Sequence, residues 1–162
     1  MENLPSSAGW LTFRFLMLPV KEQLKHAPES CVVGPARMPD LVQKAKELLR
    51  KAHSVHVSGS PAAHGDARPD NIMVLVEAGN VKQLKLVDMD WAGITGSTHY
   101  PVLLNAKTVV WPEGVGPGQP LQQKHDIDLL QLQVNPATHA SVNDWRQMFA
   151  NGVQVSDTEV DF

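Results

Sequence analysis

Cysteine and charge of one sign are both scarce in this sequence. Cys31 is the only cysteine among 162 residues, so an intrachain disulfide is impossible and a metal site built on paired cysteines is excluded. The 14 Lys and Arg nearly balance the 17 Asp and Glu, which leaves a net charge of −3. Because no long basic run occurs either, we expect no nucleic-acid partner.

Long apolar runs are also missing. The most apolar stretch, residues 10–20, is broken by Arg14 and Pro19 and follows no basic segment. This pattern predicts neither a signal peptide nor a membrane helix, so we expect a cytoplasmic or nuclear protein with no membrane partner. The composition is otherwise that of one domain, since 43% apolar residues can build a core and 12 prolines with 11 glycines indicate many turns.

Hydrophobic periodicity predicts a mixture of helices and strands. The clearest element is a β-hairpin, in which apolar runs at 72–77 and 81–87 flank a Gly79-Asn80 turn. Residues 94–123 show no helical period and predict a long irregular segment. The other expected elements are a strand at 10–18, helices at 21–26, 40–52 (capped by Asp40), 122–133 and 141–149, a short strand at 55–57 and a loop at 58–63.

The polar residues that flank this hairpin suggest a chemical site. Before it comes the octapeptide HGDARPDN at residues 64–71, and after it comes Asp88. A loop aspartate such as Asp66 can accept a proton from a hydroxyl group, and the oxygens of Asn71 and Asp88 are hard ligands that suit Mg²⁺. Since a hairpin brings its two ends together, these residues are predicted to form one site for phosphoryl transfer.

This pattern resembles the protein-kinase-like superfamily. HGDARPDN is similar to the kinase catalytic loop, in the HGD form also common in choline and aminoglycoside kinases. The resemblance implies that Asp66 is the catalytic base, that Arg68 neutralises phosphate charge and that Asn71 is a metal ligand. LVDMDWAG resembles the D-F-G segment and implies Asp88 as the second metal ligand; Asp90 is the alternative alignment.

Two further segments agree in order with this resemblance. WPE at 111–113 is similar to the motif that closes a kinase activation segment, which implies that Glu113 supports that segment. HDIDLL at 125–130 resembles the helix whose aspartate, here Asp126, braces the catalytic loop. His64 would pack and hydrogen-bond behind the metal segment. The whole pattern is most like the kinase-like proteins of filamentous and mushroom-forming fungi.

The resemblance implies an α+β fold, the mainly helical C-lobe of a protein kinase with the hairpin carrying the metal site. The glycine-rich loop and the strand lysine of a kinase N-lobe do not occur before His64, so the N-lobe is expected to be largely missing. Residues 1–38 would be a remnant of the N-lobe and hinge with a connector, 39–150 the C-lobe and 151–162 a flexible tail.

The expected activity is transfer of phosphate from ATP, with Mg²⁺, to a hydroxyl acceptor, either protein Ser/Thr or a small alcohol. The alternative is an inactive, truncated kinase-like module that binds a protein partner through its lobe-facing surface. A metal-dependent hydrolase built on His64, Asp66 and Asp88 ranks last. Three residue-level expectations complete the prediction: Arg68 could instead pair with a nearby carboxylate, His53 and His56 are exposed without a metal, and Trp91 and Trp111 fill core.

Overall fold

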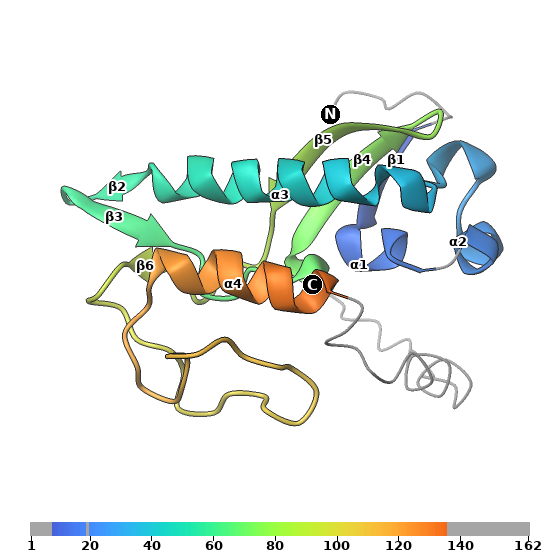
Figure 1. The fold of residues 1–162 in the computed structure, drawn as a ribbon. Coiled ribbons are helices and arrows are strands. Elements are labelled where there is room, and N and C mark those ends of the chain that lie inside the picture. The colour runs from blue at the N-terminus through green and yellow to red at the C-terminus, as the bar shows by residue number, and fades with distance from the viewer. Residues whose placement is uncertain (1–7, 19, 136–162) are drawn as a thin grey trace, which may run out of the picture.

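The computed structural model of the chain describes residues 8–18 and 20–135, which form a mixed α+β fold (Figure 1). The predicted helix at 141–149 and the tail at 151–162 lie outside these residues. The strands are β1 (Ala8–Thr12), β2 (His56–Val57), β3 (Ser60–Ala63), β4 (Ile72–Glu77), β5 (Asn80–Leu86) and β6 (Gly93–Ile94). The helices are α1 (Phe13–Leu16), α2 (Val20–His26), α3 (Met38–His53) and α4 (Gln123–Val134), with 3₁₀ turns η1 (Glu29–Cys31), η2 (Pro35–Arg37) and η3 (Pro69–Asn71).

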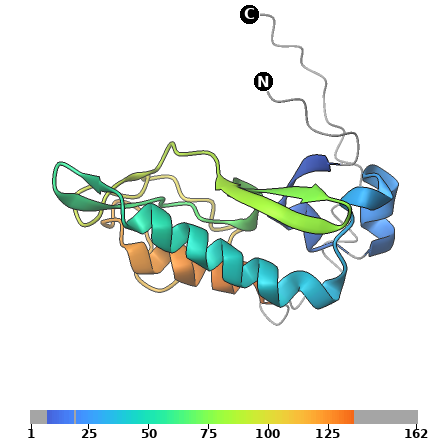
Figure 2. The ribbon, with the colours of Figure 1, turned by 90° about the horizontal axis from the view of Figure 1, so that it is seen from above.

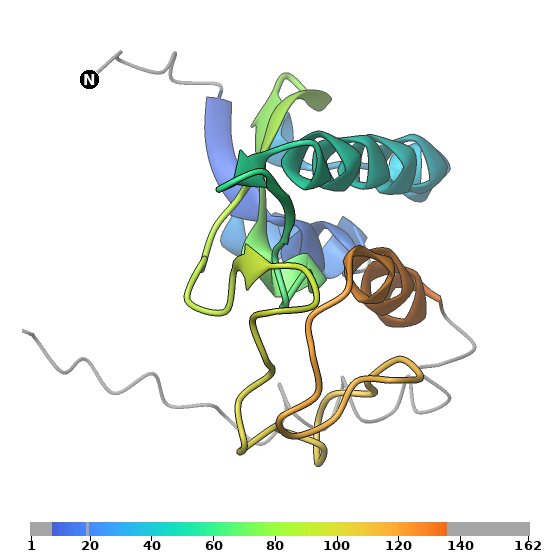
Figure 3. The ribbon, with the colours of Figure 1, turned by 90° about the vertical axis from the view of Figure 1, so that its left-hand side faces the viewer.

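The first antiparallel sheet has the order β1-β4-β5 and confirms the predicted hairpin. Ile72, Val74 and Val76 alternate along β4 and are fully buried, as a half-buried strand requires. They belong to the same core as Leu41 and Leu49 of α3, so this helix covers one face of the sheet. Figure 3 shows α3 and α4 nearly end-on, one above the other, with the sheet at their side.

The helices α3 and α4 run antiparallel, so that the end of α3 meets the beginning of α4 (Figures 1 and 2). The predicted start of α3 was wrong by two residues. The helix begins at Met38, and Asp40 lies in its first turn instead of capping it. Pro39 explains this start, because the first helical turn needs no N–H donor from it.

Two other predictions were wrong. The strand expected at 10–18 ends at Thr12, whose hydroxyl accepts a hydrogen bond from the Phe15 N–H (3.1 Å) and caps α1. A short apolar run fits a buried helix as well as a strand, and periodicity alone cannot separate them. Residues 60–63, expected as loop, form β3, which pairs with β2 and β6. Its Ser-Pro-Ala-Ala sequence has weak strand propensity, so the pairing partners decide its conformation.

The irregular segment between β6 and α4 was predicted, and so was α4 itself. This segment loops away from α4 in Figure 1 and carries a small second core around Tyr100 and Leu121. Among residues 8–18 and 20–135, no helix has both the length and the apolarity needed to cross a bilayer.

Candidate active site

The loop of residues 64–71, which follows β3 and includes η3, is mostly buried although it is rich in polar groups. His64 is 3% exposed, Asp66 5% and Asn71 6%. Buried polar groups are expensive unless they are hydrogen-bonded, so the partners of this loop determine whether it can hold its shape. Three of the predicted residues, Asp66, Arg68 and Asn71, meet directly within it.

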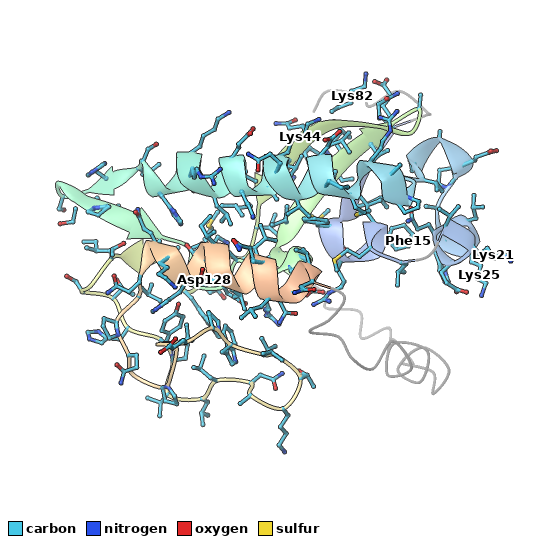
Figure 4. All side chains as sticks on the ribbon, in the orientation of Figure 1. Phe15, Lys21, Lys25, Lys44, Lys82 and Asp128 are labelled. Atoms are coloured by element: carbon cyan, nitrogen blue, oxygen red, sulfur yellow. The ribbon has the colours of Figure 1, made fainter. Side chains whose placement is uncertain are left out.

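Asp126 of α4 holds the beginning of the loop. Its Oδ2 atom accepts the backbone N–H of His64 and its Oδ1 atom accepts that of Gly65, each at 2.8 Å. The carboxylate is 1% exposed, so these bonds are shielded from water. Asp128, on the same helix (Figure 4), instead forms an ion pair with Lys124 at the surface. The two aspartates of α4 thus differ in burial and in partners.

His53 is a site residue that the sequence reasoning missed. Its Nε2 atom lies 2.8 Å from Oδ2 of Asp126, and its side chain is 10% exposed, so the expected exposure of His53 was wrong. The Gln123 side chain also donates to the carbonyl oxygen of His53 at 2.7 Å. Asp126, the partner of the His53 ring, lies 73 residues further along the chain, and no local pattern in the sequence predicts such a contact.

Both oxygens of the Asp66 carboxylate accept hydrogen bonds. Arg68 donates from Nε to Oδ1 at 2.6 Å and from Nη2 to Oδ2 at 2.7 Å, and Asn71 donates from Nδ2 to Oδ2 at 2.9 Å. Of the two expectations for Arg68, the ion pair to a nearby carboxylate is the one present. The hydrogen bond to Asp66 raises the pKa of Arg68, as do the charges of Asp66, Asp70 and Asp88, while burial opposes the rise.

Asn71 and Asp88 are brought together by the backbone of Val87. The Val87 N–H donates to the carbonyl oxygen of Asn71 at 3.0 Å, and the Val87 carbonyl oxygen lies 3.1 Å from Nε2 of His64. Since Nδ1 of His64 accepts the Asp66 N–H at 3.2 Å, Nε2 must carry the proton that bonds to Val87. His64 therefore links the loop of residues 64–71 to the segment that carries Asp88.

The oxygens that remain available at this end of the hairpin suit Mg²⁺. The Nδ2 atom of Asn71 donates to the Asp66 carbonyl and carboxylate, so Oδ1 is the atom left for a ligand. Asp88 is exposed, has a φ of 60°, and makes no hydrogen bond or ion pair within residues 8–18 and 20–135. Mg²⁺ commonly binds one or two protein oxygens and completes its shell with water and phosphate. The donor set therefore fits this ion, although the described part of the chain holds no cluster of three His, Cys, Asp or Glu.

An aromatic group packs against the other side of the loop. The rings of Trp91 and Trp111 stack with centroids 5.9 Å apart, and the Tyr100 ring lies 6.5 Å from that of Trp111. Burial, with the charges of Asp126 and Asp66, raises the pKa of Tyr100, which keeps its hydroxyl neutral. Both tryptophans are half-buried: Trp91 packs against the second core, whereas Trp111 stacks on Trp91, so the expectation that both fill core is met only in part.

The supporting role of Glu113 stays a prediction. Glu113 is exposed, and its side chain has no hydrogen bond or ion pair to any part of the chain that the structure describes. His56, in contrast, is exposed as expected, and its Nδ1 atom lies 2.8 Å from the carbonyl oxygen of Ser54. Among the described residues, neither side chain has a hydrogen bond or ion pair to Asp66, Arg68 or Asn71.

No protein-family model, curated protein or solved structure matches this chain. Only the residues of the site and their geometry therefore indicate its function.

Proposed function

We propose that this chain carries the catalytic and metal-binding part of a kinase-like phosphotransferase, with the fold of a kinase C-lobe. It would transfer the γ-phosphoryl group of Mg²⁺-ATP to a hydroxyl acceptor, either protein Ser/Thr or a small alcohol. The observation that carries the proposal is the orientation of Asn71. Its amide nitrogen is committed to Asp66, which leaves its amide oxygen for a ligand, and its backbone carbonyl is bonded to Val87, the neighbour of Asp88.

Asp66 and Arg68 would act on the reacting groups. Asp66 orients the acceptor hydroxyl and takes its proton, while the hydroxyl oxygen bonds to the γ-phosphorus and ADP leaves with the electron pair of the broken P–O bond. Arg68 offsets negative charge on the transferred group, for which its planar guanidinium is well suited. Mg²⁺ held by Asn71 and Asp88 would neutralise the phosphate oxygens.

Asp126, His53 and His64 would position these groups without touching the substrate. Asp126 fixes two backbone amides at the start of the loop, and His64 fixes Val87, the neighbour of Asp88. Phosphoryl transfer depends mainly on positioning and on electrostatic stabilisation, so a loop that is held before substrate binds favours this chemistry.

A second candidate function is that of a catalytically inactive kinase-like module that acts in binding. The closed ion pair between Asp66 and Arg68 favours it, because the arginine already bonds to both carboxylate oxygens that an acceptor hydroxyl would have to reach. The two candidates differ in whether Mg²⁺-ATP binds at Asn71 and Asp88.

Thermal unfolding with and without Mg²⁺-ATP tests the proposal. A ligand at ten times its Kd stabilises the folded state by about 1.4 kcal/mol. For a chain of this size that raises Tm by about 4 °C. We expect Asp88→Asn to abolish this shift and Asp90→Asn, a change at the neighbouring exposed aspartate, to retain it. No shift in the wild type would refute the phosphotransferase and favour the binding module; loss in Asp90→Asn alone would assign the metal to Asp90.

A further inference from the structure

The ion pair between Asp66 and Arg68 is unusually complete for one so close to solvent. Arg68 covers both carboxylate oxygens, and Asn71 adds a second donor to Oδ2. The Asp66 side chain is 7% exposed and that of Arg68 is 25% exposed, so the arginine lies between the carboxylate and water. An incoming hydroxyl group would have to compete with a bidentate, charge-assisted contact.

Arg68 also occupies the positions on Asp66 that an acceptor hydroxyl would have to reach. A guanidinium stays charged at any ordinary pH, so Arg68 leaves a carboxylate only for another anionic partner. The hydroxyl can therefore bond to Asp66 only after Arg68 has found that partner. The carboxylates of Asp70 and Asp88 act on Arg68 as well, so it already lies in the field of the metal-binding end of the hairpin.

A phosphate group is the partner that the geometry favours. Phosphate oxygens accept the same bidentate hydrogen bonds from a guanidinium as a carboxylate does. Asp70 is an unsuitable alternative, because it is already engaged by Arg14, whose Nη2 atom lies 3.1 Å from its Oδ2.

We propose that Arg68 is a latch on Asp66 that phosphate opens: the guanidinium moves from the carboxylate to a phosphate held at Asn71 and Asp88, and Asp66 is freed to accept the hydroxyl proton. This inference rests on the proposed phosphotransferase function and adds an order of events to it. Nucleotide binds first, and the acceptor binds productively only afterwards. Without nucleotide, the closed ion pair keeps Asp66 from activating water or a wrong hydroxyl.

Carbon-13 NMR of the carboxyl groups tests the latch on the full chain. We expect Mg²⁺-ATP to shift the Asp66 carboxyl signal toward its position in Arg68→Gln, where the latch is absent. The Asp128 carboxyl, paired with Lys124 at the surface of α4, is the internal control and should keep its signal. Mg²⁺ alone should leave the Asp66 signal in place, because it brings no anion. Since the main titration uses wild type, it stands even if Arg68→Gln fails to fold.

The outcomes separate this inference from the function on which it rests. Mg²⁺-ATP that raises Tm but leaves the Asp66 signal unmoved overturns the latch and spares the phosphotransferase. A shift that Mg²⁺ alone reproduces in full also overturns the latch, since phosphate would not be what opens it. If Mg²⁺-ATP changes neither Tm nor the signal, the function and the latch are both wrong.

Discussion

Residues 64–71 and Asp88 lie at the same end of the β4–β5 hairpin, yet their surroundings differ. The loop is buried, and its Asp66 carboxylate, Asn71 amide nitrogen and first two backbone amides are all hydrogen-bonded. Asp88 is exposed, has positive φ, and has no hydrogen bond among the described residues. One half of the site is therefore built by the fold, while the other half keeps its carboxylate available for a ligand. Mutations should separate the two.

Removing Asp126 should cause the largest loss of stability, because it holds the buried loop of residues 64–71. In Asp126→Ala the His64 and Gly65 amides and the His53 ring lose their buried partner, so we expect the free energy of unfolding to fall by about 3–5 kcal/mol. Urea denaturation measures this change. Asp128→Ala is the matched control on the same helix, and loss of its surface ion pair should cost less than about 1 kcal/mol. Equal losses would show that Asp126 does not brace the loop.

A substitution at Gly65 should destabilise the same loop by a smaller amount. Its φ is 84°, and an added Cβ would lie 3.0 Å from the Trp91 carbonyl oxygen. We expect Gly65→Ala to lower the free energy of unfolding by about 2–3 kcal/mol, because strained backbone and a close contact add. Gly96→Ala isolates the backbone part: its φ is 79° but its Cβ would meet nothing within 4 Å, so about 1 kcal/mol is expected. Similar losses in the two variants would mean that Trp91 moves away from the added Cβ at little cost.

The pH dependence of stability should report on His125, beside Asp126. Burial lowers the pKa of His125, with Lys124 adding to the effect and Asp126 and Asp128 opposing it. As the pH falls below the ordinary histidine value of about 6.5, the unfolded chain takes up this proton before the folded one does. Stability is then lost toward acid pH, in the window between the ordinary and the lowered value.

Denaturation at pH 7.5 and pH 5.5 measures this loss. We expect it to be smaller in His125→Gln than in the wild type and unchanged in His99→Gln, which removes an exposed histidine. A wild-type slope in His125→Gln would assign the acid sensitivity to other groups.

The smallest stability effect is expected at the exposed Asp88. Without ligand, Asp88→Asn should change the free energy of unfolding by less than about 0.5 kcal/mol, since Asp88 is exposed and asparagine tolerates positive φ. The same variant should lose its response to Mg²⁺-ATP. A large loss of stability without nucleotide would show that Asp88 stabilises the fold as the buried loop does, and the two parts of the site would not differ.

Much of the frame could be predicted from local patterns. Alternating burial along β4 and a two-residue turn specify the hairpin wherever it packs, so Asn71 and Asp88 had to lie near one another. The turn is Ala78-Gly79, both with positive φ, and not the expected Gly79-Asn80, because Asn80 already pairs with Glu77. Predictions failed where two conformations suit the same residues, as at Phe13–Leu16, or where pairing partners decide, as in β3. Nothing near His53 in the sequence predicts its burial, because the antiparallel packing of α3 and α4 creates it.

The sequence by itself determined which chemical groups this protein has and which of them flank the hairpin, because periodicity and turn chemistry act over a few residues. Only the tertiary structure decided how those groups are engaged. It closed Arg68 on Asp66, added His53 to the Asp126 brace, and left Asp88 exposed. The physical reason is that burial and hydrogen-bond partners depend on which distant segments pack together, and a buried polar group accepts whichever partner that packing supplies.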